Sequence, residues 1–309
     1  MSVESNTRMS VCVAIPTYNR ESVLIRTLQS VFAQNPSADE VLVIDQTDEH
    51  EIETDKYLAG EDKAGRIRWI RQSPPNLPAA RNRALKETKC DVLIFIDDDV
   101  LMPANFVEKH RRNYIDPRIV AVAGRVIQKG IVVPDRKKWP SIMDHRFFPL
   151  DSFKRVEGVV AFRGCNHSVR VCNLSAIGGF DLNYIGWAFR EDSDVALRLW
   201  KAGGVIVFDP DACLNHLAIP TGGCRLKNNN KSLSEWMVSF PATYFACRHL
   251  FPSRWFWYDI FIGNVRRYIL RKDNVYRPWR LPFAIASYFY SFIRAMWLSA
   301  NWQQKKAHC

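Results

Sequence analysis

The sequence lacks the features that mark several common protein classes. Its eight cysteines include no CxxC pair and are scattered over 309 residues, so no disulfide framework is predicted. No GxGxxG fingerprint occurs, which argues against a dinucleotide site of the usual kind. The N-terminal residues are polar and include Glu4 and Arg8, unlike a secretory signal peptide. Together these absences favour a globular protein of the reducing cytosol.

Basic charge is distributed unevenly along the chain. Residues 220–309 contain 14 Lys and Arg against 3 Asp and Glu, whereas residues 1–219 contain 29 of each sign. The same C-terminal segment holds 20 of the 38 aromatic residues. We therefore expect a neutral catalytic domain over residues 1–220 and a basic, aromatic helical region over residues 221–309 that has a different partner.

The first hundred residues alternate between buried-type strands and amphipathic helices. Short apolar runs predict strands at residues 11–16, 40–44, 66–71 and 92–96, and helical spacing predicts helices at 22–34 and 78–87. This alternation predicts an α/β fold with a Rossmann-like, mostly parallel sheet flanked by helices. Further strands are expected at 119–127, 156–162, 167–171 and 205–208, with helices at 191–202, 255–270 and 281–302.

Three consecutive acids follow the fourth strand. Asp97, Asp98 and Asp99 come directly after residues 92–96, and α/β sheets bind ligands at the carboxyl ends of their strands. Adjacent carboxylates repel one another, which a bound cation would relieve. Oxygen ligands favour Mg²⁺ or Mn²⁺, and such an ion commonly holds the phosphates of a substrate. The alternative is an acidic turn in which one Asp caps the next helix.

An ordered set of motifs resembles one enzyme family. The segments are VAIPTYNR (13–20), Asp45, AARNRAL (79–85), DDD (97–99), FREDSDVALRLWKAG (189–203) and His216. In this order and spacing they resemble the family 2 glycosyltransferases, which are inverting enzymes of the GT-A fold. The resemblance covers roughly residues 10–220 and leaves the C-terminal region outside it.

The resemblance implies a reaction and a metal site. A sugar moves from a nucleoside diphosphate, UDP- or dTDP-linked, to an acceptor hydroxyl, and a divalent ion offsets the charge of the leaving diphosphate. The DxD pattern of the family matches Asp97 and Asp99, so both are expected at the Mn²⁺ or Mg²⁺ ion, Asp97 also contacting the donor. Asp98, between them, is expected beside the donor. His216 is implied as a further ligand, although a lone His is often a hydrogen-bonded core residue.

The resemblance also implies a set of nucleotide-binding residues. They are Pro16, Thr17, Tyr18 and Arg20 in the loop after the first strand, with Asp45, Arg81 and Asn82. A carboxylate such as Asp45 can accept a hydrogen bond from an N–H of the nucleobase, and a turn residue is the alternative. For Asn82 a structural role stays open.

Inversion requires one general base and no covalent intermediate. Asp192 matches the second acid of the ED pair that supplies this base in the family, and Glu191 is the reserve. Both acids could instead stabilise the first turn of a helix. Trp187, just upstream, could stack on an acceptor sugar or pack in the core.

One motif departs from the family pattern. The segment GCNHSVR (164–170) fits G-x-N-x-x-x-R but places His167 in the wall of the donor site. Nothing in the sequence discriminates between donor sugars.

The C-terminal region has the composition of helices that lie in a membrane interface. Residues 281–293 are uncharged, but these 13 residues are fewer than the roughly 20 needed to span a bilayer. Trp and Tyr suit the headgroup layer, and Arg and Lys suit anionic lipid. The alternative is packing on the catalytic domain or on a second copy as a homo-oligomer. No nucleic-acid partner is expected, because no stacking or helix-turn-helix motif accompanies the charge.

We therefore predict a metal-dependent, inverting hexosyltransferase at the cytoplasmic face of the plasma membrane. Its acceptor would be a hydroxyl of a glycan or of a lipid-linked acceptor in cell-surface polysaccharide synthesis. One alternative is a sugar-phosphate nucleotidyltransferase, which would need a Gly-rich basic loop where PTYNR stands. The other is a non-catalytic, sugar- or membrane-binding relative, although every expected carboxylate is present.

Overall fold

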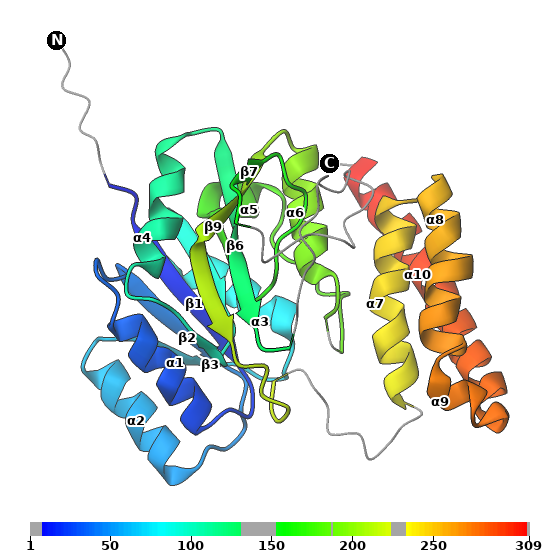
Figure 1. Ribbon diagram of the computed structural model, residues 1–309, viewed down its shortest axis with the longest axis horizontal. Coiled ribbons are helices and arrows are strands. Elements are labelled where there is room, and N and C mark those ends of the chain that lie inside the picture. Colours follow the sequence, from blue (N-terminus) through cyan, green and yellow to red (C-terminus); the bar gives the residue numbers. More distant parts are fainter. Residues whose placement is uncertain (1–7, 131–152, 187, 224–232, 308–309) are drawn as a thin grey trace. The chain divides into compact units, whose positions relative to one another are not determined.

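The computed structural model describes residues 8–130, 153–186, 188–223 and 233–307, and the chain divides into two compact units (Figure 1). The α/β unit comprises residues 1–182 and 192–225, and the helical unit comprises residues 183–191 and 226–309. Residues 183–191, which the sequence analysis assigned to the catalytic domain, thus group with the C-terminal helices.

A mixed sheet forms the centre of the α/β unit. In the described residues its strand order is β3-β2-β1-β4-β8-β6-β9-β5, with β7 paired to β9. The strands are β1 (Val11–Thr17), β2 (Glu40–Asp45), β3 (Arg68–Arg71), β4 (Val92–Ile96), β5 (Val100–Leu101), β6 (Ile119–Gln128), β7 (Val156–Glu157), β8 (Asn166–Arg170) and β9 (Val205–His216). The first four are parallel, which confirms the predicted α/β fold, and β8 runs antiparallel between β4 and β6.

Helices cover the sheet because alternate residues of its central strands face opposite sides. Val13 of β1 packs in one apolar cluster with Leu24 of α1, whereas Ala14 packs in a second cluster with Ala80 of α3. The helices of this unit are α1 (Ser22–Phe32), α2 (Ile52–Lys63), α3 (Leu77–Glu87), α4 (Phe106–Arg111), the 3-10 helix η1 (Arg112–Ile115), α5 (Val171–Ala176) and α6 (Glu191–Lys201).

Two predicted strands have different lengths in the structure. The strand predicted at 205–208 continues as β9 to His216, because β9 pairs along its length with β6. The strand predicted at 156–162 is reduced to the two residues of β7. Strand ends therefore depend on the partner strand as well as on local apolar content.

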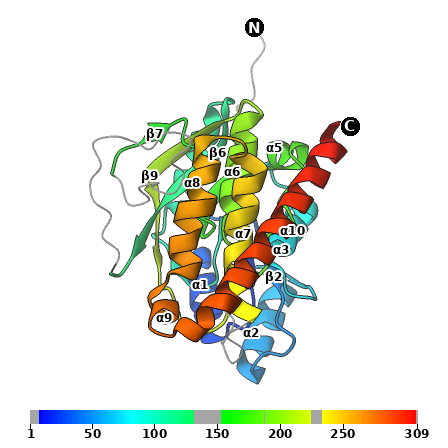
Figure 2. The same cartoon turned by 90° about the vertical axis from the view of Figure 1, so that its right-hand side faces the viewer.

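The helical unit is built around two long helices, α7 (Leu233–His249) and α10 (Leu281–Ala307), which pack on each other (Figure 2). Shorter segments connect them: α8 (Arg254–Tyr258), the π-helices η3 (Asp259–Gly263) and η4 (Val265–Ile269), α9 (Lys272–Val275) and the 3-10 helix η5 (Pro278–Arg280). Among the described helices, none has both the length and the apolar character that crossing a membrane requires.

Candidate active site

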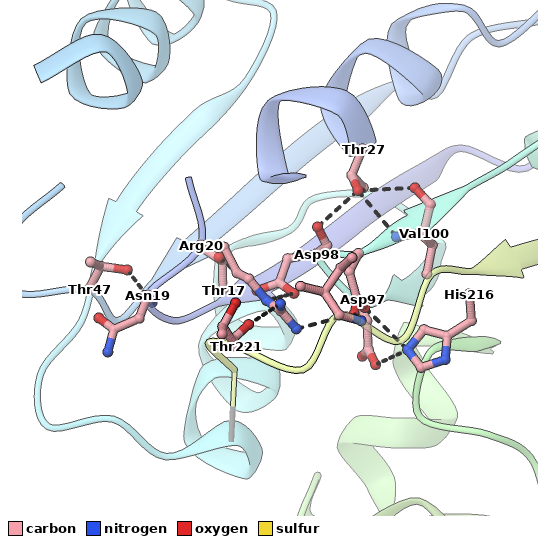
Figure 3. A network of polar contacts seen from close by, with 12 residues as sticks. Thr17, Asn19, Arg20, Thr27, Thr47, Asp97, Asp98, Val100, His216 and Thr221 are labelled. Atoms are coloured by element: carbon pink, nitrogen blue, oxygen red, sulfur yellow. Dashed lines mark hydrogen bonds and ion pairs between the residues drawn. The ribbon is translucent and has the colours of Figure 1, made fainter. Parts of the chain in front are cut away.

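The acidic motif lies at the carboxyl end of β4, where three side chains have different surroundings. The side chain of Asp97 is 36% exposed, whereas Asp98 and Asp99 are almost completely buried. Thr27 of α1 supports the turn, because its hydroxyl lies 2.9 and 3.0 Å from the Asp98 and Val100 carbonyl oxygens and accepts from the Val100 N–H (Figure 3). A buried helix side chain thus holds the backbone that carries the acids.

Asp97, Asp99 and His216 form a cluster that could hold a cation. One ligand atom of each side chain lies within 4.8 Å of the others. His216 Nε2 lies 3.2 Å from Asp99 Oδ1 and 3.9 Å from Asp97 Oδ2 (Figure 3). Two carboxylates and one imidazole are a donor set that fits a divalent metal ion.

Strand pairing explains how His216 reaches the acids. It ends β9, where it pairs with Val100 of β5 on one side and with Gln128 of β6 on the other. Its Nδ1 lies 2.9 Å from Gln128 Oε1. With a cation bound, a proton on Nδ1 donated to that oxygen would leave the Nε2 lone pair free to ligate the ion. The predicted proximity of His216 to the DxD acids is therefore present in the structure.

Arg20 neutralises part of the acidic cluster. Its Nε donates to Asp98 Oδ1 at 3.0 Å, and its Nη2 donates to Asp99 Oδ2 at 3.2 Å (Figure 3). Thr17 donates to the second oxygen of Asp98 at 2.9 Å. Asp98 therefore has hydrogen-bond partners within the chain on both oxygens.

The pKa values of the two buried acids move in opposite directions. Burial raises the pKa of Asp98 to about 7, and the charge of Arg20 only partly opposes this rise. Burial also acts to raise the pKa of Asp99, but the hydrogen bond and charge of His216, with Arg20, hold that pKa below its ordinary value. Asp99 is thus the acid whose charged form its neighbours favour.

The segment after β9 is fastened to both the acids and the loop after β1. The N–H groups of Leu217 and Ile219 donate to the backbone oxygen and the carboxylate of Asp99, each at 2.9 Å. The Gly223 N–H donates to the Tyr18 carbonyl at 2.7 Å, and Arg20 Nη1 donates to the Thr221 carbonyl. We call residues 217–223 the clasp. Of the loop residues expected at the nucleotide, Thr17, Tyr18 and Arg20 all contact either the acids or the clasp, and Pro16 is buried in β1.

Asp45 is saturated by contacts within the chain. Its Oδ1 accepts from the Thr47 N–H at 3.0 Å, and its Oδ2 lies 2.8 Å from both His50 Nε2 and Trp69 Nε1. The Asp45 side chain is completely buried. Thr47 in turn accepts from the Asn19 N–H at 2.9 Å, which ties this cluster to the loop after β1 (Figure 3). Sequence reasoning missed His50 and Trp69, since neither belongs to a motif.

Arg81 and Asn82 of α3 have different surroundings. Arg81 is buried between the Phe95 and Phe180 rings; its Nη2 donates to the Gly164 carbonyl at 3.1 Å and lies 3.9 Å from Asp97 Oδ1. Asn82 bonds through its side chain to both the N–H and the carbonyl of Phe180, at 2.7 and 2.8 Å. Arg81 thus reaches the acids, whereas the contacts of Asn82 are structural.

Gly164 connects the acidic motif to Asp192. Its carbonyl accepts from Arg81, which faces Asp97, and its N–H donates to Asp192 Oδ2 at 2.9 Å. Asp192 Oδ1 accepts from the Ser193 N–H at 2.6 Å. Asp97 and Asp192, 95 positions apart in the sequence, are thus linked through one arginine and one glycine of the α/β unit.

The residues near Asp192 in the sequence have different surroundings. Glu191, the reserve base, is buried and belongs to the helical unit by its contacts. Trp187 lies outside the described residues. Asp194 is completely buried, and its Oδ2 lies 2.7 Å from Arg198 Nη2, one turn later in α6. This ion pair stabilises the helix.

His167 lies inside an aromatic stack of the core. Its ring is parallel to Phe162, with centroids 4.3 Å apart, and stacks on Phe95 at 5.2 Å. Burial holds the pKa of His167 well below its ordinary value, so the imidazole is neutral. The departure from the family motif therefore adds an aromatic layer beneath the strands and presents no side chain at the surface of the site.

Two family models match this chain. The family model described as "Glycosyl transferase family 2" matches residues 12–171, and the one described as "Glycosyl transferase family group 2" matches residues 92–301. The second match includes most of the C-terminal helices, which the motif resemblance left out.

The O-antigen chain rhamnosyltransferase RfbN of Salmonella typhimurium is 32% identical over 220 residues, which cover 67% of this chain and 66% of that protein. A pre-mycofactocin glycosyltransferase of Mycobacterium tuberculosis is 26% identical over 212 residues, covering 67% of this chain but 42% of that protein. The chain thus spans less than half the length of this second relative. A mannosyltransferase from Pyrobaculum calidifontis, solved with GDP-Man and Mn²⁺, superposes with a TM-score of 0.59 at 17% identity, covering 97% of this chain and 81% of that one.

Proposed function

The chain belongs to glycosyl transferase family 2 and is a glycosyltransferase of the GT-A fold, and on this premise we propose that it is a metal-dependent, inverting enzyme. Its donor would be a nucleoside-diphosphate sugar, UDP- or dTDP-linked, and its acceptor a hydroxyl group. The observation that carries the proposal is the link from Asp97 through Arg81 and Gly164 to Asp192. This link supports a site in which the candidate metal ligands and the candidate base act together.

Asp97, Asp99 and His216 are the residues that would hold the ion. The imidazole favours Mn²⁺ over Mg²⁺, because Mg²⁺ prefers oxygen ligands. When bound, the ion would supply positive charge to the leaving diphosphate. The Mn²⁺ in the solved mannosyltransferase supports this assignment.

Asp192 is the proposed general base. It would take the proton of the acceptor hydroxyl while the acceptor oxygen bonds to the anomeric carbon and the bond from that carbon to the diphosphate breaks. The N–H groups of Gly164 and Ser193 orient its two oxygens. Glu191, buried at the start of the same helix, is the alternative base.

The remaining residues would position the donor. Arg81 lies beside Asp97 and could neutralise a phosphate oxygen. Arg20 and Thr17 hold Asp98 and the loop that we propose contacts the nucleotide. Asp45 would act by holding Thr47 and Asn19 in that loop, because both of its oxygens already accept hydrogen bonds within the chain.

The acceptor would be a glycan or a lipid-linked acceptor of cell-surface polysaccharide synthesis, which the rhamnosyltransferase relative supports. We further propose that the basic C-terminal region lies against an anionic membrane, at the inner face of the plasma membrane. A homo-oligomer through the same region is the alternative.

A screen of nucleotide sugars for thermal stabilisation tests the proposal. We expect a UDP- or dTDP-sugar to raise the melting temperature in the presence of Mn²⁺ but not in chelator. The same donor should then support sugar transfer to a hydroxyl acceptor, with inverted anomeric configuration. Stabilisation by no nucleotide sugar, or retention of configuration in the product, would contradict it.

A further inference from the structure

Helix α10 buries mostly small residues and directs several large apolar residues outward. The buried positions form one stripe at helical spacing: Ala284, Tyr288, Ser291, Ala295 and Ser299. The outward positions include Phe283, Phe289, Ile293 and Trp297, which are 62 to 72% exposed. A helix that packs on a protein core in water shows the opposite arrangement.

Hydroxyl hydrogen bonds also lie among the buried apolar side chains of the helical unit. Ser291 of α10 and Ser239 of α7 share a hydrogen bond of 3.0 Å between their hydroxyls. Thr243 donates to the Ser239 carbonyl at 2.8 Å, and Tyr288 donates to the Ile260 carbonyl at 2.7 Å. Small residues and hydroxyl hydrogen bonds between helices, with bulky apolar groups outside, are the packing that a lipid environment favours.

The segment that joins η4 to α10 adds cations and aromatic rings. Tyr276 and Trp279 are 79% and 67% exposed, and Leu270 and Val275 are about half exposed. The segment 270–280 also contains four cationic side chains, Arg271, Lys272, Arg277 and Arg280, against the single acid Asp273. It forms one end of the helical unit, where α9 lies next to the start of α10 (Figure 2). Aromatic rings at headgroup depth and cations facing anionic lipid are the features of an interfacial anchor.

We infer that the outer face of α10 and the segment 270–280 insert into the apolar margin of an anionic membrane. This inference deepens the proposed membrane contact by naming the inserted face, and it rests on that part of the proposed function. We assign lipid as the partner of this face because exposed apolar side chains and net positive charge occur on the same helices, as binding to an anionic membrane requires. The helix would lie in the interface plane, since no described helix is long and apolar enough to cross.

Vesicle flotation of the full chain tests the inference. We expect the wild type to float with vesicles of phosphatidylcholine and phosphatidylglycerol, and less with phosphatidylcholine alone. The variant Phe289→Ser/Ile293→Ser should bind at least about 10-fold more weakly, because each change removes an apolar side chain that the lipid would bury. Quenching of tryptophan fluorescence by brominated lipid should fall in parallel.

A matched control is Ile52→Ser/Ile115→Ser, which removes two apolar side chains, 72% and 80% exposed, from the α/β unit. This control should float like the wild type. Equal flotation of both double variants, or a wild type that does not float, would overturn the inference. So would a wild-type dimer without lipid affinity that Phe289→Ser/Ile293→Ser converts to a monomer, which would identify a second copy as the occupant.

Stabilisation by Mn²⁺ and nucleotide sugar, measured on the same proteins, separates this inference from the proposed reaction. If a variant loses flotation but still binds nucleotide sugar, the substitution has affected membrane binding and not the proposed active site. Flotation without nucleotide binding would instead contradict the proposed catalytic function.

Discussion

The Nε of Arg20 donates to Asp98 Oδ1 at 3.0 Å, across 78 positions of the sequence. From the sequence, a bound cation is expected to relieve the repulsion among the three acids. Arg20 supplies part of that positive charge from within the chain, through Nε to Asp98 and through Nη2 to Asp99. Ligand atoms of Asp97, Asp99 and His216 still lie close enough together to hold a divalent cation.

Replacing Asp99 tests the metal site. Asp99→Asn removes one charge from the cluster, so we expect transfer to fall by at least about 100-fold, the scale of losing a principal electrostatic contact. Isothermal titration with Mn²⁺ should show a matching loss of binding. Asp55→Asn, on the exposed side of α2, is the control and should change neither. Wild-type Mn²⁺ affinity in Asp99→Asn would exclude Asp99 as a ligand.

Removing the metal should stop the reaction reversibly. Dialysis against EDTA is expected to abolish transfer, and Mn²⁺ should restore it more fully than Mg²⁺ because His216 offers nitrogen. Initial rates with each ion after dialysis measure this. Full activity in excess chelator would rule out a metal-dependent mechanism.

Replacing Asp192 should separate chemistry from donor binding. Asp192→Asn keeps a hydrogen-bond acceptor for the Gly164 N–H but loses the base, so kcat should fall by about 100- to 10,000-fold. Donor-induced thermal stabilisation should persist. The same measurements on Glu191→Gln decide between the two acids: if only that variant loses turnover, Glu191 is the base.

The clasp should be needed for activity. An added Cβ at Gly222 would lie 2.3 Å from the Asn19 carbonyl oxygen, and its φ of +77° already favours glycine. Gly222→Ala should therefore displace the clasp and lower kcat/KM by about 10-fold or more. Gly178→Ala is the matched control, because its φ is +80° with nothing within 4 Å of the new Cβ. Equal kinetics in both variants would show that the clasp is dispensable.

Acid should destabilise the α/β unit through His110. Burial lowers the pKa of His110 to about 4, below the ordinary value of 6.5, so the folded state binds this proton less readily than the unfolded chain. Its contribution is complete above pH 6.5 and is lost as the pH falls toward 4. Between pH 7 and pH 5 the loss is about 2 kcal/mol.

Urea unfolding at both pH values, with chelator present, measures this loss. His110→Gln should be less stable at pH 7 but less sensitive to pH. His167, also buried and neutral, leaves a residual dependence of the same sign. An unchanged pH dependence in the variant would refute the assignment to His110.

The parallel half of the fold could be predicted because its signals are local. The apolar runs of β4 and β1 are properties of consecutive residues, and both strands are present as expected. The strand β8 was expected, but its antiparallel direction and the full length of β9 could not be predicted, because pairing partners set them. The same holds for Asp45: a motif indicated the residue, but only folding shows that His50 and Trp69 occupy its carboxylate.

The sequence alone determined the family and the types of side chain at the site. Acids after an apolar strand and an ordered set of motifs can be recognised without knowing the fold. The sequence also determined that charge and aromatic residues concentrate at the C-terminus. Only the tertiary structure decided that Arg20 holds Asp98, that Gly164 links Arg81 to Asp192, and that α10 faces outward with its largest apolar residues. Those facts depend on distances between residues remote in the chain, which strand register and helix packing set.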